Sequence, residues 1–412
     1  MIWPSVPLRA LYRRVEERNR PDLPPLSVYR DLGVVPREGR EDNYNKLSDD
    51  LTAYKVVRPG DLVLNKMKTW QGSIGVSDYE GIVSPAYFIG RRIADVDSRF
   101  MHHLLRSAPL IAEYGARSKG IRPSQWDLPW DEFTAIRVNV PPLATQRAIA
   151  DYLDTETAHI DALIEKKRRT IDLLDERNVA LAHEAITGVP IAGVRRESSL
   201  PWLGDLPSHW RLAPVATQFR VDLGRMLNAE RAAVGEMRPY VRNINVRWDI
   251  VDVTDLAEMD FPSPERRQYR LLPGDLLINE GGAGVGRSAI WHGELDECYF
   301  QKSVLRLRPI GHSCPEWMLE CMRVAVGMKV PLVEGNLATI PHVPAEALRV
   351  YRFPFPQQDK QNAMLAWLHD ERSRDRPLRS ATVNQIDLLA ERRQALITAA
   401  VTGELDVPGV AA

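Results

Sequence analysis

The sequence predicts an α+β protein with two mixed α/β domains separated by two long antiparallel coiled-coil helices, related by an internal pseudo-two-fold repeat. Three observations support this. The two halves of the 412-residue chain resemble each other, each half ends in a long periodic stretch, and short apolar runs follow Pro-Gly turns elsewhere. A chain of this length can form two or three domains.

The repeat is clearest in the second part of each half. Gln146–Leu153 resembles Gln361–Leu368 at an offset of 215 residues, and the same offset aligns Ile171–Leu174 with the identical Ile386–Leu389. The Pro-Gly-Asp-Leu turns at 59–62 and 273–276 continue the repeat more weakly. Such self-similarity indicates a duplicated element whose tails share one task while the globular parts have diverged.

The tails are predicted to be helices. No Pro or Gly occurs from Thr145 to Thr187, and apolar residues recur there at steps of three, four and seven. The second tail, Gln357 to Thr402, has the same pattern, but Pro377 predicts a bend or a break. Because an apolar stripe must be covered, we expect the tails to pair through Ile160, Leu163, Ile171, Leu174, Leu181, Ile386, Leu389 and Leu396.

These patterns predict five segments. They are a first domain (1–142), a central helix (143–188), a Gly/Pro/Ser-rich linker (189–209), a second domain (210–356), and a C-terminal helix with its tail (357–412).

The composition predicts a soluble cytoplasmic protein. There is no apolar run long enough to cross a membrane, no secretory signal, and only three cysteines. With 54 basic and 55 acidic residues the net charge is −1, so any nucleic-acid surface must be a local patch.

No catalytic or metal-binding constellation is predicted. The segment 281–288 (GGAGVGRS) approaches a phosphate-binding loop but has Arg287 in place of the lysine, so a glycine-rich turn is the simpler interpretation. Asp161 and Glu165 lie within a predicted helix and indicate only a charged surface. The cysteines lack the spacing of a zinc site.

One stretch has the charge expected of a DNA-binding surface. Lys55–Arg122 contains 11 basic and 6 acidic residues, interleaved with amide and indole side chains that can contact phosphates and base edges. A solvated surface of mixed charge is the alternative. The candidate DNA-binding residues are Asn65, Lys66, Lys68, Trp70, Gln71, Arg91, Arg117, Lys119, Arg122 and, in the second half, Asn279, Arg287, Gln301, Lys302 and Asn336.

The tails and the linker resemble a known family. The motif Pro-Pro-x-x-x-Gln-Arg-x-Ile-Ala-x-Tyr-Leu-Asp spans 141–154, and the first tail closes with Ile186-Thr187-Gly188. The second tail ends in Val401–Leu405, and the linker carries Leu200–Trp210. Together with the two Pro-Gly-Asp-Leu turns, these features resemble the specificity subunit of type I restriction–modification systems over essentially the whole chain.

The resemblance implies a non-catalytic subunit that determines which DNA sequence the complex recognises. Two target-recognition domains would each bind one half of a bipartite, asymmetric site in double-stranded DNA, and the paired helices would fix the spacing between the half-sites. The tails would dock two methyltransferase (modification) subunits, and restriction/translocase subunits would join them. The chain itself would hold no cofactor, since S-adenosylmethionine, ATP and Mg belong to the partner subunits.

Two alternatives remain open from the sequence. A stand-alone DNA-processing enzyme is opposed by the lack of catalytic motifs. A duplicated protein-interaction scaffold without direct DNA readout would also explain the apolar tails, and the basic excess at 55–122 argues against it.

Overall fold

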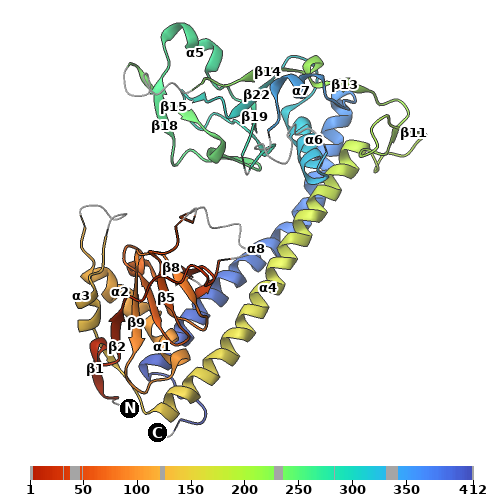
Figure 1. Ribbon diagram of the computed structural model, residues 1–412. Helices are drawn as coiled ribbons and strands as arrows, with labels where there is room; N and C mark the ends of the chain where they lie inside the picture. The colour runs from red at the N-terminus through yellow and green to blue at the C-terminus, as the bar shows by residue number, and fades with distance from the viewer. Residues whose placement is uncertain are drawn as a thin grey trace. The chain divides into compact units, whose positions relative to one another are not determined.

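The computed structural model describes residues 3–30, 32–37, 47–48, 50–120, 126–226, 235–282, 284–330 and 342–410. The chain forms two compact units, each a β-rich head together with parts of the two long helices (Figure 1). Unit 1 comprises Met1–Arg168 and Val383–Ala412, and unit 2 comprises Arg169–Thr382. The predicted α+β class is confirmed.

The head of unit 1 is built around a four-stranded antiparallel sheet with the strand order β2-β9-β6-β7. Three two-stranded ladders, β1-β10, β3-β4 and β5-β8, complete the head. Its elements are β1 (Ser5–Pro7), β2 (Tyr12–Val15), β3 (Leu26–Tyr29), β4 (Gly33–Pro36), β5 (Lys55–Val57), β6 (Leu62–Asn65), β7 (Ile74–Val76), β8 (Gly81–Val83), β9 (Tyr87–Arg92), α1 (Ser98–Leu105), α2 (Ala108–Arg117), α3 (Trp130–Ala135) and β10 (Arg137–Asn139).

The head of unit 2 repeats the central sheet with the order β14-β22-β19-β20 and adds a three-stranded sheet, β18-β15-β21. Its elements are β11 (Arg195–Glu197), β12 (Asp205–Pro207), β13 (Leu212–Pro214), β14 (Phe219–Leu223), β15 (Met237–Val241), β16 (Val246–Arg247), β17 (Ile250–Val251), β18 (Ala257–Asp260), α5 (Ser263–Tyr269), β19 (Leu276–Asn279), β20 (Ser288–Ile290), β21 (Tyr299–Phe300), β22 (Val304–Pro309), α6 (Pro315–Gly327), α7 (Ala345–Val350) and β23 (Arg352–Pro354).

The two long helices are α4 (Leu143–Thr187) and α8 (Gln358–Thr402). They pair antiparallel in each unit. In unit 1, Asp161 bonds Arg393 at 2.9 Å and Lys167 bonds Gln385. In unit 2, Asp175 pairs with Arg379, and Arg177 with Asp375 at 3.0 Å.

Helix α8 is not broken at Pro377, contrary to one outcome that the sequence allowed. Proline inside a helix costs roughly 3 kcal/mol because it removes an N–H and crowds the preceding turn. In α8, contacts on both sides of the proline secure the helix. Arg372 pairs with Glu320 before it, and Arg379 pairs with Asp175 after it.

The predicted pairing stripe is buried only in part. Ile160 and Leu181 are 4% and 8% exposed, and Ile171, Leu174, Ile386, Leu389 and Leu396 are partly buried. Leu163 is 45% exposed, because its neighbour Ile164, about 100° further round the helix, takes the inward position at 8% exposure. The prediction that Leu163 is covered by the partner helix is therefore wrong.

Each head packs against both long helices. In unit 1 the core includes Ile149 and Leu153 from the start of α4 and Val401 from the end of α8. In unit 2 it includes Met364 and Leu368 from the start of α8, and also Leu181, Ala182, Ala185 and Ile186 from the end of α4. A head is thus fixed by the beginning of one helix and the end of the other.

The long helices end at equivalent glycines. Gly188 and Gly403 have φ values of +65° and +81°, the left-handed conformation that terminates helices. A Cβ at Gly188 would lie 2.9 Å from the Trp210 ring, and one at Gly403 would lie 3.1 Å from the Trp3 ring. The repeated Thr-Gly motif therefore closes each helix under a tryptophan of a head.

We predict that His102→Gln flattens the pH dependence of stability. Burial, with a smaller effect from Arg106, lowers the pKa of His102 to about 3. The unfolded chain therefore binds a proton below about pH 6.5 that the native chain does not. This histidine's contribution is complete above that pH and falls on acidification by up to about 1.4 kcal/mol per pH unit. Urea unfolding of both proteins between pH 7.5 and 4.5 measures the difference, and equal slopes would contradict the prediction.

Candidate nucleic-acid interface

Equivalent hairpins of the two central sheets present loops of equal length. Strands β6 and β7 are joined by residues 66–73, and β19 and β20 by residues 280–287, so each loop has eight residues. The same backbone bond closes each loop, from Asn65 N–H to Ser73 O at 3.0 Å and from Asn279 N–H to Arg287 O at 2.9 Å. We call these segments loop A (66–73) and loop B (280–287).

The start of each hairpin is held by the same ion pair. In the Pro-Gly-Asp-Leu turn of unit 1, buried Asp61 accepts the N–H of Arg58 and binds Arg91 at 3.1 Å. In unit 2, buried Asp275 accepts the N–H of Leu272 and pairs with Arg308 at 2.6 Å. This repeated ion pair therefore holds the first turn of each hairpin against a neighbouring strand of the sheet.

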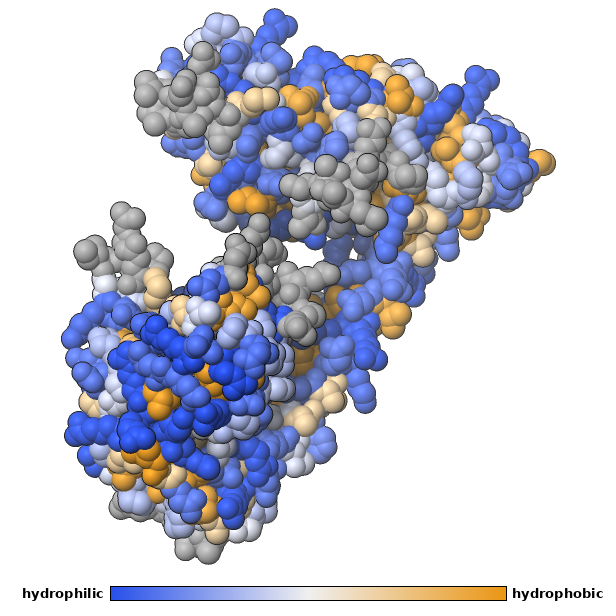
Figure 2. Space-filling view, in the orientation of Figure 1, coloured by the Kyte–Doolittle hydropathy of each residue, from blue (hydrophilic) through white to orange (hydrophobic). Residues whose placement is uncertain are grey.

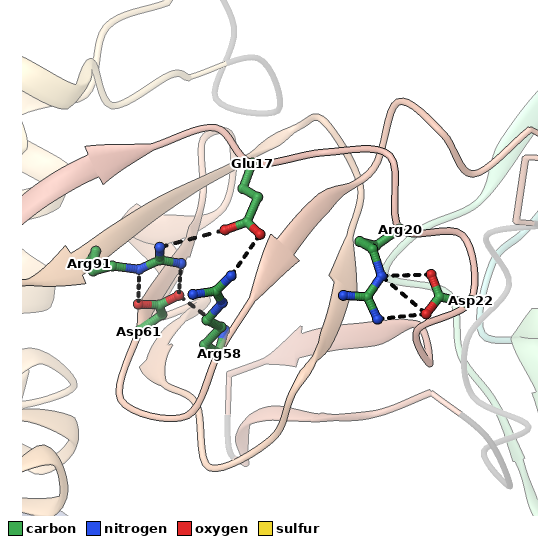
Figure 3. Close-up of polar contacts among 6 residues, drawn as sticks. All are labelled: Glu17, Arg20, Asp22, Arg58, Asp61 and Arg91. Atoms are coloured by element: carbon green, nitrogen blue, oxygen red, sulfur yellow. Dashed lines mark hydrogen bonds and ion pairs between the residues drawn. The ribbon is translucent and has the colours of Figure 1, made fainter.

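The predicted DNA-binding residue Arg91 takes part in this ion pair. Its guanidinium lies across the Asp61 carboxylate and 3.6 Å from Glu17, which also binds Arg58 (Figure 3). A second pair in the same head, Arg20–Asp22, is likewise satisfied within the chain (Figure 3). Arg91 is thus held by two carboxylates of its own head, and its contact with DNA stays a prediction.

Loop A gathers four of the predicted residues. Lys68 is exposed, whereas Nζ of Lys66 lies 4.6 Å from the centre of the Phe88 ring. The ring centroids of Trp70 and Trp126 lie 5.0 Å apart. The side chain of Gln71 accepts a hydrogen bond from Arg30. Asn65 lies at the base of the loop, where its Oδ1 accepts the Met67 N–H.

A second segment of unit 1 joins loop A. The N–H of Leu128 donates to the carbonyl of Lys66 at 3.0 Å, and Lys119 and Asp127 bond each other through their backbones. Arg117 and Lys119 both lie near Glu132, at 3.6 and 3.0 Å, so their charge is partly neutralised within the chain. Arg122 lies outside the described residues.

The predicted residues of unit 2 divide into two groups. Arg287 in loop B and Lys302 are exposed and Gln301 is partly buried, all at the end of the sheet where β19 stops and β22 begins. Asn279 is only 1% exposed and its Nδ2 donates to the carbonyl of Val246, so it supports the loop and cannot contact DNA. Asn336 lies outside the described residues.

Two cationic features were missed from the sequence. In unit 1, Arg14 stacks on Phe88 at 4.8 Å, beside the largely buried Lys55, whose pKa is lowered by burial. In unit 2, a hollow of about 1160 Å³ is bordered by Arg220, Arg266, Arg267, Arg270 and Arg308. Three of these arginines are paired within the chain, Arg220 with Asp222, Arg266 with Glu236 and Arg308 with Asp275. Folding brings Arg220 and Arg308 to the cluster at 266–270 from distant parts of the sequence.

A glutamine at the start of each long helix joins it to its head. In unit 1, Gln146 accepts the N–H of Asp97, the N-cap of α1, and donates to the carbonyl of Pro141, both at 2.8 Å. In unit 2, Gln361 accepts the N–H of Cys314, the N-cap of α6, at 3.2 Å and donates to Pro356 at 2.8 Å. Both glutamines are buried, at 2% and 1% exposure.

Ion pairs also connect each head to its long helix. The head supplies the cation in unit 1 and the carboxylate in unit 2. In unit 1, Arg99 of α1 binds Asp154 of α4 at 2.7 Å, and His103 lies 3.2 Å from the same carboxylate. These partners lower the pKa of Asp154, with the hydrogen bond to His103 as the largest cause. In unit 2 the head supplies the carboxylate, since buried Glu320 of α6 receives both terminal nitrogens of Arg372 of α8 at 2.6 Å.

Within the described part of the chain, no cluster of metal-ligating side chains is found. Nor, among those residues, does any helix have the length and apolar character needed to cross a membrane.

Comparison with known proteins gives a curated relative and several solved structures. The chain is 27% identical over 169 residues to the type I restriction enzyme EcoKI specificity subunit of Escherichia coli (strain K12), which covers 40% of this chain and 32% of that protein. A solved structure described as the structural basis of complex assembly and conformational transition of the type I R-M system matches with a TM-score of 0.57, 17% identity and 98% coverage of both chains. The HsdS subunit of Thermoanaerobacter tengcongensis gives a TM-score of 0.38 at 19% identity, over 98% of this chain and 97% of that one. No family model matches the sequence.

The first of these structures shares its fold with this chain. Among the proteins similar to this chain, the curated relative is a type I restriction enzyme specificity subunit. The match spans only about a third of the length of that relative.

We predict that Gln146→Leu destabilises unit 1. The substitution leaves the Asp97 N–H and the Pro141 carbonyl without partners at a buried joint, at a cost of about 2–4 kcal/mol. Urea unfolding measures the change. The matched control is Arg147→Leu at the exposed neighbouring position, which should change stability by less than about 0.5 kcal/mol. Equal effects of the two variants would contradict the role of the glutamine.

Proposed function

We propose that the chain is the DNA sequence-specificity subunit of a type I restriction–modification complex. The observation that carries the proposal is the pair of hairpins with one frame and two different loops. Loop A is KMKTWQGS, is preceded by Asn65 and is cationic, whereas loop B is glycine-rich and ends in Arg287. Two hairpins that share their backbone bonds and ion pair but differ in their loop residues are expected of two sites that recognise two different sequences.

The chemistry of the loops suits double-stranded DNA. Lys68, Arg287 and Lys302 are exposed cations that can neutralise phosphates, and the Arg287 guanidinium can also bind guanine through two hydrogen bonds. The partly buried Lys66, Trp70, Gln71 and Gln301 lie beside them. We therefore retain these seven residues as DNA contacts, with Lys119 as a weaker one.

Domains 1–142 and 210–356 are assigned as the two target-recognition domains. Because each head packs on the long helices, the length of the helix pair would set the number of unread base pairs between half-sites. The helix pair, whose buried apolar residues hold it together, would thus determine the distance between the two half-sites.

The partners follow from the family. The chain would assemble in the cytoplasm with two methyltransferase subunits, which use S-adenosylmethionine, and with restriction/translocase subunits, which use ATP and Mg. A duplicated scaffold that binds only proteins would need no cationic loop at the same sheet end of both heads.

We predict that Lys68→Ala weakens DNA binding and lowers the salt dependence by about one phosphate, a change of about 0.9 in the slope of log K against log salt concentration. Fluorescence anisotropy from 50 to 300 mM salt measures it. Lys360→Ala, which removes a lysine paired with Asp359 on α8, is the control and should leave the slope unchanged. An unchanged slope for Lys68→Ala would place loop A away from DNA.

The modular assignment predicts the result of a domain exchange. Replacing residues 200–356 by those of a relative with another target should change one half-site of the methylated motif and leave the other intact. Base-resolution methylation mapping in cells gives the result. If both half-sites change, the heads do not act separately, and if no methylation motif depends on this chain, it is a scaffold.

A further inference from the structure

A further hairpin lies beside loop A in unit 1 and beside loop B in unit 2. Strands β3 and β4 pair antiparallel and contact β7, which follows loop A, whereas β16 and β17 pair antiparallel and contact β20, which follows loop B. In unit 1, the side chain of Arg30 at the turn of hairpin β3–β4 donates to Gln71 of loop A. In unit 2, Asn279 at the base of loop B donates to the carbonyl of Val246 in β16 at 3.0 Å. The two hairpins therefore occupy equivalent places.

In unit 1 a single arginine holds the hairpin against the end of loop A. Arg106, at the end of α1, donates to the carbonyls of Tyr29 and Arg30 at the turn of β3–β4. The same guanidinium donates at 3.1 Å to the carbonyl of Ile74, the first residue after loop A. It therefore connects the hairpin to the loop.

In unit 2, Arg323 of α6 makes the corresponding connection through the turn of β16–β17. The carboxylate of Asp249 in that turn accepts a hydrogen bond from Arg323. The N–H of Asp249 donates at 3.1 Å to the carbonyl of Ser288, the first residue after loop B. The Arg323 guanidinium also lies 4.7 Å from the centre of the Trp248 ring. This turn is thus held from both sides.

The two arginines occupy equivalent positions. Each lies nine residues after the N-cap of its helix. Three residues before Arg106, His103 contacts a carboxylate of α4, and three residues before Arg323, Glu320 binds an arginine of α8. Residues three positions apart share a helix face. The same face of the helix therefore contacts both the long helix and the hairpin in each unit.

Both turns contain a residue in the left-handed conformation. Gly33 has φ +74° and Asp249 has φ +67°. A Cβ at Gly33 would lie 2.5 Å from Cε1 of His102, so this turn packs closely on α1. Aspartate adopts the left-handed conformation more readily than most residues, and in Asp249 the bond to Arg323 adds to that preference. Each turn is therefore held in one conformation.

The connection in unit 2 is a buried charge network. Arg323 and Glu320 are each 5% exposed, and Glu320 binds both Arg323 and Arg372. Removing charges from water is unfavourable, and well-packed apolar side chains stabilise a fold at least as well. Charge-assisted hydrogen bonds instead fix geometry. The network thus indicates that the orientation of the hairpin matters.

Both hairpins expose an arginine next to an aliphatic side chain. Arg30 and Leu32 are exposed at the turn of β3–β4, and Arg247 and Ile250 flank the turn of β16–β17. Arg247 pairs with Asp252 at 3.0 Å, but its side chain remains 64% exposed. On the face shown in Figure 2, small groups of hydrophobic residues lie among hydrophilic ones in both heads, so exposure alone identifies no site. What distinguishes these residues is their place beside loops A and B, on hairpins that are held rigidly.

We propose that hairpins β3–β4 and β16–β17 are further DNA-recognition segments, and that Arg106 and Arg323 are the residues that position them. An arginine can donate two hydrogen bonds to guanine, and an aliphatic side chain can contact the methyl group of thymine. The base-contacting residues are Arg30, Leu32, Arg247 and Ile250. Each hairpin contacts the half-site that the loop beside it also contacts. The inference rests on the proposed function and adds specificity-determining residues to it.

The experiment measures the selectivity for each half-site separately. The probes are fluorescent duplexes that carry the motif mapped by methylation in cells, and duplexes in which one or the other half-site is replaced. Fluorescence anisotropy gives the Kd of the full-length chain assembled with the methyltransferase subunit of the same system. Arg30→Ala should lower the selectivity for one half-site by about 10-fold and leave the other unchanged, and Arg247→Ala should do the reverse.

Matched controls remove an exposed arginine elsewhere in each head. Arg9 follows β1 and Arg211 precedes β13, and neither belongs to a hairpin of the proposed segments. Arg9→Ala and Arg211→Ala should leave the selectivity for both half-sites unchanged.

The positioning role of Arg323 has its own measurement. Arg323→Ala should lower the selectivity for the same half-site as Arg247→Ala, and Arg323→Lys should restore part of it. A role in folding alone would lower the stability to urea without a loss of selectivity confined to one half-site. If Arg323→Ala does not fold, the exposed Arg30 and Arg247 still decide the question.

The outcomes separate the two proposals. If Arg30→Ala and Arg247→Ala weaken binding equally on intact and replaced half-sites, these arginines bind phosphates and the inference is wrong. If neither variant changes binding, the hairpins do not contact DNA and the inference is again wrong. In both cases a wild-type complex that prefers its own motif leaves the proposed function standing. A wild-type complex that binds all the duplexes alike contradicts the proposed function itself.

Discussion

The hydrogen bonds of Gln146 and Gln361 are the constraint on which the rest of the structure depends. Each glutamine lies at the start of a long helix, and its amide is shared between the helix's own proline-containing entry and the first helix that follows the head's central sheet. The carbonyl oxygen and the amino group of an amide lie in one fixed plane, so the bond to the head and the bond to the helix entry together restrict the orientation of head and helix. The loops at the sheet end can then be held at a defined place relative to the helix that carries them.

The ion pairs around these glutamines make the two joints different. The head of unit 1 supplies cations to carboxylates of α4, while the head of unit 2 supplies Glu320 to Arg372 of α8. A head placed on the other helix would bring Glu320 towards Asp154, and like charges at such a distance repel. The glutamine gives both joints the same geometry, and the charges assign each head to its own helix.

The sequence predicted those parts of the fold that repeat or keep a period. The long helices were evident because 3.6-residue spacing over 45 residues leaves little ambiguity, and the Pro-Gly-Asp-Leu turn marked the hairpins. The candidate site was predicted less well. Arg91 and Asn279 have the residue types of DNA contacts, but one is held by Asp61 and the other is buried under Val246. Such partners come from strands far away in the sequence, so charge and amide counts cannot reveal them. Leu163 was misplaced because both it and Ile164 fit a heptad pattern, and only packing decides between them.

Comparing equivalent residues in the two halves of the chain shows which positions are the same and which differ. The buried positions Gln146 and Gln361 are identical and make equivalent hydrogen bonds in the two units. Loop positions have diverged on an unchanged frame, from Lys68 and Trp70 in loop A to a run of glycines in loop B. Exposed helix positions include diverged pairs, such as Asp161 and Arg376, and identical pairs, such as Asp172 and Asp387. Identity between the two copies therefore indicates a structural constraint where the side chain is buried and makes the same bonds in both units, as Gln146 and Gln361 do.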